Sequence, residues 1–294
     1  MKNTFCIVAS LLFVWLTACQ SQPPFASAQA VTENPLININ AASLEVTYLA
    51  NEGFMVAGGG HKVLLDALFG KGLRHYAAVS PAQRELLEQA RAPYADVDAV
   101  FATHFHDDHF NAESVLSHLT HNPQAFFFST NQAADKLRAT GKFEPVKSRV
   151  MAALPKEGER LRHRHRGIDV QLLNIHHGRT RPTENLGFII ELGGKRILHI
   201  GDSEAEPSVF QKYEVAKERI DVAFLPFWYF LNDESKRAVR EHMQPRNIVV
   251  MHLEQDFLPG RTGHDNWQKR WAQIKAEFPN ASYFTQELEK KQFD

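Results

Sequence analysis

The pattern H-x-H-x-D-H in His104-Phe105-His106-Asp107-Asp108-His109 places three imidazoles and an aspartate within six residues. Imidazole nitrogen and carboxylate oxygen are donors that suit zinc and the neighbouring first-row metals, and such close spacing allows one loop to serve two ions. The alternative is a run of surface histidines near a helix cap. We favour a metal site, because chance clusters of histidine rarely follow a buried strand.

The segments on either side of this motif predict how it is positioned. Residues 97–102 (VDAVFA) are short, apolar and β-prone, as in a buried strand. Residues 111–116 (NAESVL) have the character of a helix start. The metal-type side chains are therefore predicted to leave the end of a strand in a tight loop.

A motif of this kind after a strand resembles that of the metallo-β-lactamase-fold hydrolases, and the resemblance extends over residues 44–284. Asp66 closes a predicted strand at the family's first motif, where the aspartate braces the metal loop without touching metal. Asp202 follows a glycine at a later strand end and matches the fourth motif, a carboxylate whose two oxygens can each face a separate ion. His252, after the strand predicted at 247–251, matches the fifth motif.

Two adjacent histidines compete for the family's third motif, which lies on a loop after a strand. His176 and His177 follow the apolar run 170–175, and successive side chains of a strand point in opposite directions, so the two do not face the site together. We favour His177, because the family's ligand often precedes a small residue, here Gly178. His176 stays open as the alternative.

The resemblance implies a dinuclear zinc centre like that of the glyoxalase II and lactonase branches, with Mn²⁺ or Fe²⁺ as alternative metals. It departs from the antibiotic-hydrolysing relatives, which lack the bridging aspartate and in one group use a cysteine. Carried over residue by residue, it assigns His104, His106 and His177 to one ion, Asp108, His109 and His252 to the second, and Asp202 to both.

Such a centre implies a metal-dependent hydrolase. Two cations lower the pKa of a bound water toward about 7, which gives hydroxide at neutral pH for attack on an ester, lactone, amide or phosphodiester. Asp108 would orient the nucleophile and Asp202 would bridge the ions, so both are candidate catalytic residues. The expected substrate is a small molecule or a lipid, as in the lactonase and phospholipase D-like branch. The alternatives are a β-lactamase and a non-hydrolytic protein of this fold, either an iron redox enzyme or a ligand-binding lipoprotein.

The rhythm of strands and helices predicts the fold that the resemblance implies, a four-layer αββα sandwich of the α/β class with metals at one edge. Apolar hairpins turn at Gly58-Gly59-Gly60 and at Gly193-Gly194. The strand at 247–251 is predicted to be the last one. The basic run at 160–166 alternates but lacks an aspartate-histidine pair, and we predict a solvated sheet edge there.

The N-terminus predicts a processed and anchored protein. An apolar stretch too short to span a membrane comfortably leads into Leu16-Thr17-Ala18-Cys19, which resembles the lipobox of bacterial lipoproteins. Residues 1–18 are then a signal peptide, 19–43 a flexible tether, and 44–294 the hydrolase domain. We expect a lipid on Cys19 that anchors the protein in the cell envelope, at the outer membrane facing the periplasm. An ordinary secretory signal with an incidental cysteine is the alternative.

Composition narrows the function further. The chain has 33 basic and 34 acidic residues and a net charge of −1, which gives no electrostatic footprint for nucleic acid. Its two cysteines are Cys6 and Cys19, inside and at the end of the predicted signal. The predicted domain therefore has no thiol to serve as nucleophile or ligand.

Overall fold

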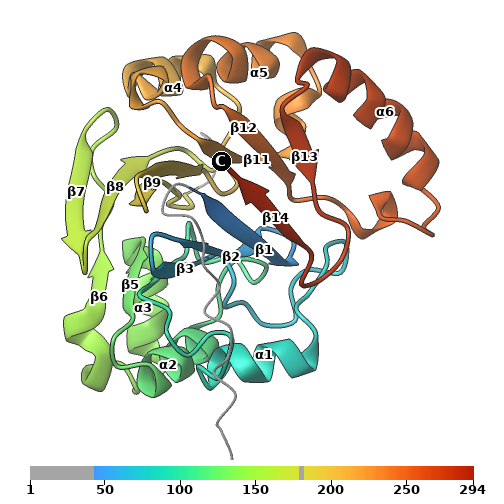
Figure 1. Cartoon of the computed structure of the whole chain (residues 1–294). Coiled ribbons are helices and arrows are strands. Elements are labelled where there is room, and N and C mark those ends of the chain that lie inside the picture. The colour runs from blue at the N-terminus through green and yellow to red at the C-terminus, as the bar shows by residue number, and fades with distance from the viewer. Residues whose placement is uncertain (1–42, 179–181) are drawn as a thin grey trace, which may run out of the picture. The chain divides into compact units, whose positions relative to one another are not determined.

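The computed structural model describes residues 43–178 and 182–294. Their strands form two seven-stranded mixed sheets that pack face to face, and helices cover the outer face of each sheet (Figure 1). The predicted four-layer αββα sandwich is therefore confirmed. The predicted signal peptide, with Cys19 and nearly all of the predicted tether, lies outside the described residues. No helix in the described part of the chain is long and apolar enough to cross a bilayer.

The first sheet is built by an antiparallel meander that leads into parallel strands. Strands β1, β2 and β3 run antiparallel, and β3 begins a parallel run with β4, β5 and β6. A helix connects each consecutive parallel pair, because the chain must cross back to the start of the sheet before the next parallel strand can begin. The elements are β1 (Leu44–Ala50), β2 (Gly53–Gly58), β3 (His61–Leu65), α1 (Pro81–Glu88), β4 (Ala99–Phe101), α2 (Ala112–His121), β5 (Phe126–Ser129), α3 (Asn131–Ala139) and β6 (Val150–Ala152).

The second sheet repeats this order of elements. Strands β8, β9 and β10 run antiparallel, and β10 begins a parallel run with β11, β12 and β13. The sequence has no evident internal repeat, so the repetition is one of topology. The elements are β8 (Ile168–Asn174), β9 (Leu186–Leu192), β10 (Lys195–His199), α4 (Pro207–Lys212), β11 (Val222–Pro226), α5 (Asp233–Arg237), β12 (Asn247–Met251), α6 (His264–Glu277) and β13 (Ala281–Tyr283).

One further strand extends each sheet at its antiparallel edge. The basic run forms β7 (Arg160–His165), which pairs only with β8, so the predicted sheet edge is confirmed. β14 (Lys290–Phe293) pairs with β1. The prediction that 247–251 is the last strand is wrong, because β13 and β14 follow it. β13 has three residues and β14 reads Lys-Lys-Gln-Phe, so neither carries the apolar run by which strands are detected.

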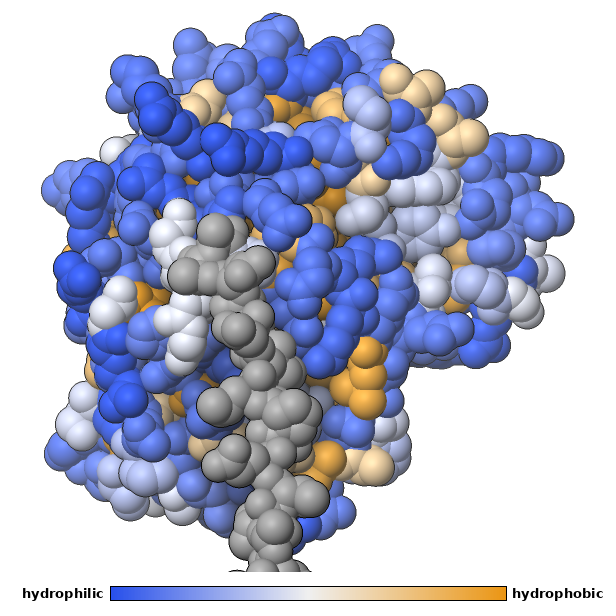
Figure 2. Space-filling view, viewed as in Figure 1, coloured by the Kyte–Doolittle hydropathy of each residue, from blue (hydrophilic) through white to orange (hydrophobic). Residues whose placement is uncertain are grey.

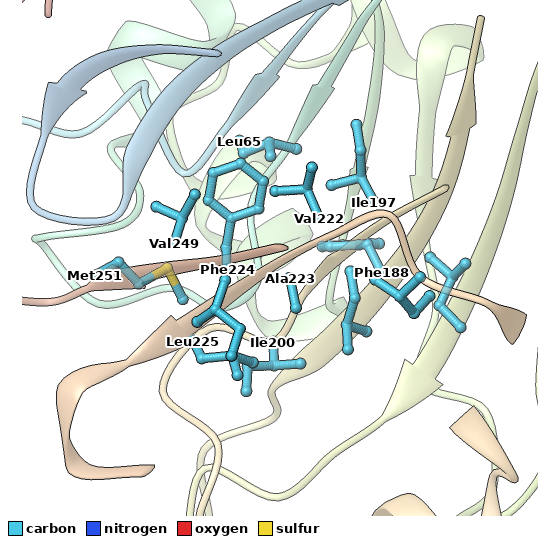
Figure 3. Close-up of a cluster of buried hydrophobic side chains, with 14 of the residues drawn as sticks. Leu65, Phe188, Ile197, Ile200, Val222, Ala223, Phe224, Leu225, Val249 and Met251 are labelled. Carbon is cyan, nitrogen blue, oxygen red and sulfur yellow. The ribbon is translucent and has the colours of Figure 1, made fainter. Parts of the chain in front are cut away.

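Apolar side chains from both sheets fill the space between them. Ring centroids of Phe54 on β2 and Phe224 on β11 lie 4.7 Å apart across this interface. Figure 3 shows Leu65 of the first sheet beside Phe224 and Val222 of the second. A second apolar cluster lies between the first sheet and α1, α2 and α3. On the face of the molecule drawn in Figure 2, most of the described residues at the surface are hydrophilic.

Two hairpin turns meet where the sheets approach each other at the edge opposite the carboxyl ends of β3 and β10. Gly59 and Gly193 have φ of 58° and 59°, in the left-handed region that glycine occupies without strain. A Cβ on Gly59 would stand 2.3 Å from the Cα of Gly193. The turn glycines therefore serve two purposes, because they close each hairpin and allow the two backbones to touch.

Candidate metal centre

The site residues lie at strand ends along one edge of the sandwich. Asp66 and His252 directly follow their strands and have φ of 40° and 57°, a backbone conformation that non-glycine residues rarely adopt and that often marks functional sites. The residues predicted from sequence come from the segments after β3 (Asp66), β4 (His104, His106, Asp108, His109), β8 (His177), β10 (Asp202) and β12 (His252).

Three histidines and one carboxylate oxygen form the first cluster. Nε2 of His104 lies 2.9 Å from Nδ1 of His106. Nε2 of His177 lies 3.4 Å, and Nε2 of His104 lies 3.9 Å, from Oδ2 of Asp202. One donor atom from each of these four residues falls within 4.8 Å of all the others. The loop after β4 thus meets the connection after β8 at a common point.

A second cluster lies beside the first. Nε2 of His252 is 3.1 Å, and Nε2 of His109 is 3.3 Å, from Oδ1 of Asp202. Oδ2 of Asp108 is 3.5 Å from His252 Nε2 and 3.8 Å from His109 Nε2. The set of donors that lie within 4.8 Å of one another here contains Glu52, His109, Asp202 and His252, and does not include Asp108.

Asp202 faces both clusters. Its Oδ2 is directed at the histidines of the first cluster, and its Oδ1 at those of the second. Gly201 before it has φ of 54°, and a Cβ there would stand 2.5 Å from Oγ1 of Thr103. Only glycine lets this strand end approach the metal loop so closely.

The two candidates for the third motif point to different places. His177 lies in the first cluster and its side chain is 6% exposed. His176 Nε2 instead donates a hydrogen bond of 2.9 Å to Oε2 of Glu157, and its side chain is 30% exposed. Lys212 and His176 together hold the pKa of the Glu157 carboxyl at about 2 through their hydrogen bonds. The geometry therefore brings His177, and not His176, to the other metal-type side chains.

Asp66 braces the metal loop in the manner that the resemblance implies. Its Oδ1 accepts a hydrogen bond of 2.7 Å from the Thr103 backbone N–H, and its Oδ2 accepts one of 2.6 Å from the Thr103 hydroxyl. Nδ1 of His109 donates to the same Oδ2 at 2.8 Å. The last bond leaves Nε2 of His109 directed at Asp202, so Asp66 fixes the orientation of a ring that would bind metal.

Charge and burial set the protonation of the cluster in the metal-free protein. Burial lowers the pKa of His104 well below its usual value, and lowers that of His106 as well, which keeps both rings neutral as metal binding requires. Burial would raise the pKa of Asp202, but His252 and His109 outweigh it and hold that pKa well below its usual value. His104, His106 and Asp202 thus have the protonation that metal ligands need.

Many of the donor atoms at the site are buried but make no hydrogen bonds to one another. Within the described residues, several buried atoms of this cluster make no hydrogen bond, although imidazole nitrogens lie 3.1–3.9 Å from carboxylate oxygens. Buried polar atoms in proteins are normally satisfied, and a bound cation would satisfy these. The atoms are Oδ1 of Asp108 and Asp202, Nε2 of His109, and both ring nitrogens of His177 and His252.

The sequence did not predict two residues beneath the second cluster. Asn51 and Glu52 form the turn between β1 and β2, and neither is more than 1% exposed. Nδ2 of Asn51 donates to Oδ2 of Asp108 at 3.4 Å, and Oε2 of Glu52 lies 3.4 Å from Nδ1 of His109. Burial raises the pKa of Glu52 well above its usual value, against the lowering effect of His109. A polar pair at a hairpin turn is the usual surface pattern, so the sequence carries no signal of this burial.

Two pockets open on either side of the clusters. One has a volume of about 800 Å³ and reaches along Glu204, Trp228 and Arg237, and the other has about 720 Å³ and reaches along Phe105 and Lys136. Both share four lining residues at their junction. These are Tyr76, His177, Asp202 and His252.

The αββα sandwich and a histidine-carboxylate cluster at its edge define a class of metal-dependent enzyme. The family model of the beta-lactamase superfamily domain matches residues 61–257. The chain therefore belongs to the beta-lactamase superfamily, and it is a metal-dependent hydrolase of that superfamily.

Individual relatives agree with this membership. A metal-dependent hydrolase from Symbiobacterium thermophilum is 28% identical over 217 residues, which cover 71% of this chain and 84% of the relative. A metallo hydrolase from the archaeon Ignicoccus hospitalis has a similar structure, with a TM-score of 0.54, 19% identity, and coverage of 86% of this chain and 99% of that one. A diiron β-hydroxylase from Streptomyces venezuelae shares the fold at a TM-score of 0.55 and 15% identity, over 85% of this chain and 54% of that one.

Proposed function

We propose that this hydrolase uses two metal ions, zinc by preference, to cleave an ester, lactone, amide or phosphodiester bond in a small molecule or lipid. The observation that carries the proposal is the position of Asp202, whose two oxygens face two separate groups of imidazoles. A carboxylate in that position suits two ions a few ångströms apart. Zinc suits the first group, because imidazole nitrogens and carboxylate oxygens are common zinc ligands.

When bound, the metal supplies a nucleophile at neutral pH by lowering the pKa of a water, and it polarises the scissile bond. The chain itself holds the donors in place through Asp66 and presents Asp108 toward the second cluster, where its carboxylate can accept a proton or orient the nucleophile. Tyr76 packs its ring edge-on against His252, with centroids 4.1 Å apart. Burial, reinforced by Asp202, raises the pKa of Tyr76 to about 12, so the phenol keeps its proton and can donate a hydrogen bond to a substrate oxygen.

The two pockets support a substrate with a group on each side of the scissile bond. Each has a volume within the range of small-molecule sites. Three large hydrophobic side chains are more than two-fifths exposed among the described residues, and two of them, Leu73 and Leu231, line these pockets. Apolar walls beside a polar centre suit an acyl chain or a hydrophobic leaving group.

A substrate panel with defined metal content tests this function. The protein would be stripped with a chelator, reloaded with zinc, manganese or iron, and given ester, lactone, β-lactam, amide and phosphodiester substrates. We expect metal-dependent hydrolysis of at least one class, and Tyr76→Phe should lower kcat by about tenfold or more if its hydroxyl contacts a reacting oxygen. Turnover that required iron and oxygen would instead establish a redox enzyme, and turnover of the β-lactam alone would establish a β-lactamase.

We further propose that the protein is a lipoprotein of the bacterial cell envelope, anchored through Cys19 at the outer membrane and facing the periplasm. The support is the Leu-Thr-Ala-Cys sequence at residues 16–19. Labelled palmitate should enter the wild-type protein, and Cys19→Ser should remain unprocessed or leave the membrane fraction. Failure of the label to enter wild-type protein in a competent bacterial host would contradict the lipid anchor.

A further inference from the structure

The turn between β1 and β2 places a carboxylate under the second cluster. Tight two-residue hairpin turns normally point their side chains into solvent, but Glu52 is fully buried. Its backbone oxygen accepts a hydrogen bond of 3.4 Å from Nε2 of His199, whose Nδ1 in turn accepts one of 3.3 Å from the Gly201 N–H. The turn is thereby tied to the strand end that carries Asp202. These hydrogen bonds fix the position of Glu52 relative to Asp202.

Neither carboxylate oxygen of Glu52 makes a hydrogen bond within the described residues. The adjacent Nδ1 of His109, 3.4 Å from Oε2, already donates to Asp66. Buried polar atoms in proteins are normally hydrogen-bonded or face an ion, so two carboxyl oxygens without a hydrogen bond need an explanation. Glu52 therefore lacks the partner that its burial demands.

The geometry of the second cluster provides a place for that cation. One oxygen of Glu52 falls within 4.8 Å of donor atoms of His109, Asp202 and His252. Carboxylate oxygens and imidazole nitrogens are both common metal ligands, so these four side chains could hold a single ion. Glu52 thus belongs to the same set of possible donors as His109, Asp202 and His252.

The repeated topology supports the same conclusion. The connection after β8, the first strand of the second meander, delivers His177 to the first cluster. The connection after β1, the first strand of the first meander, delivers Glu52 to the second cluster. The first connection of each sheet therefore contributes one residue to the site. In the second sheet this residue is His177, in the first cluster, and in the first sheet it is Glu52, in the second cluster.

We propose that Glu52 is a ligand of the second metal ion and makes this site richer in oxygen than the first. The inference rests on the proposed two-metal function. The first site has three imidazoles and one carboxylate oxygen, whereas the second has two imidazoles, Asp202 and Glu52, with Asp108 close by. Imidazole-rich sites suit zinc, and carboxylate oxygens suit manganese. The second site accordingly retains a larger share of manganese than the first when both metals are offered.

Metal content measured by mass spectrometry tests the assignment without any assay of activity. Stripped wild type, Glu52→Gln and the control Asp107→Asn would each be dialysed against zinc, against manganese, and against an equal mixture. Asp107 is an exposed carboxylate next to Asp108 and belongs to neither donor set. We expect about two ions in the wild type and in Asp107→Asn, and about one in Glu52→Gln. Any second ion that remains in Glu52→Gln should be zinc, and the manganese share should fall at least severalfold.

Thermal unfolding separates a ligand from a merely structural residue. Glu52→Gln keeps the size of a buried side chain whose carboxyl oxygens make no hydrogen bond within the described residues, so the Tm of the metal-free protein should change little, while the Tm of the loaded protein should fall. Equal losses in both forms with unchanged metal content would overturn the assignment and leave Glu52 a folding residue. Two ions in Glu52→Gln, with the wild-type share of manganese, would overturn it and leave the two-metal function intact. A single ion in the wild type would overturn that function and the role of Glu52 with it.

Discussion

The first sheet contributes most of its metal-type side chains from one loop after β4, whereas the second contributes His177, Asp202 and His252 from three separate strand ends. Asp66, after β3 of the same sheet, holds this loop through two hydrogen bonds to Thr103 and one to His109. Within the described residues, both ring nitrogens of His177 and of His252 lack a hydrogen bond. The protein's own hydrogen bonds thus fix the loop of the first half, whereas no hydrogen bond within the described residues orients the rings of His177 and His252 in the second half.

Asp202→Asn tests the point where the halves meet, and its expected effect is the largest. The variant keeps the size of the side chain but removes the charge that faces both clusters, so both ions should bind more weakly. We expect fewer than about two ions per chain and hydrolysis reduced by orders of magnitude. Metal analysis and hydrolysis rates of protein purified without added metal check this. Unchanged values for both would rule out the bridge.

His177→Ala tests the half that depends on metal, and His176→Ala is its matched control. His177→Ala should lose roughly one of the two ions and lower the Tm of the loaded protein, while the Tm of the metal-free protein changes little. His176→Ala should retain both ions, because that ring is paired with Glu157. The reverse pattern in elemental analysis would assign the ligand to His176.

Asp66→Asn tests the half that the protein arranges. The substitution removes the charge at the centre of three buried hydrogen bonds, so the free energy of unfolding should fall by about 3 kcal/mol or more. Since these bonds need no metal, the loss should appear in the metal-free and loaded proteins alike. Urea denaturation of both forms measures it. If the free energy of unfolding fell only in the loaded form, the first half would depend on metal as the second half does, and the proposed difference between them would be wrong.

His118→Asn should have the smallest effect at the site, because His118 lies on α2 behind the first sheet. Its Nδ1 donates to the Leu87 carbonyl oxygen at 2.6 Å, and burial lowers its pKa to about 4. The unfolded chain takes up this proton below a pH of about 6.5 and the folded chain does not, so stability is lost as the pH falls from about 6.5 to about 4. This titration of His118 lowers the free energy of unfolding by on the order of 3 kcal/mol across that pH range.

The measurement for His118 is the free energy of unfolding across that pH range. Asn keeps a donor near the position of Nδ1 but does not titrate, so His118→Asn should lose stability less steeply with falling pH than the wild type. Equal slopes in the variant and the wild type would show that His118 does not contribute to the pH dependence.

The same contrast between the halves explains what the sequence could predict. A motif within six residues after an apolar strand is visible by itself, and capping residues such as Asn111, which accepts from the Ser114 N–H at 3.0 Å, mark the helix that follows. His177, Asp202 and His252 stand alone in the sequence and could be proposed only through a family pattern. Glu52 was missed because its burial depends on packing between segments almost 150 residues apart. The strands β13 and β14 were missed because short or charged strands carry no apolar run.

The contact between Gly59 and Gly193 bears on where this protein tolerates additional sequence. Turns between hairpin strands are usually the safest places to insert a tag or a reporter, because they lie at the surface. Here a Cβ on either glycine would collide with the backbone of the other turn, whereas one on Gly60 or Gly194 would meet nothing within 4 Å. Neither turn therefore has room for a side chain at the point where the two backbones touch. An insertion should be placed after Gly60 or Gly194, one residue beyond the contact.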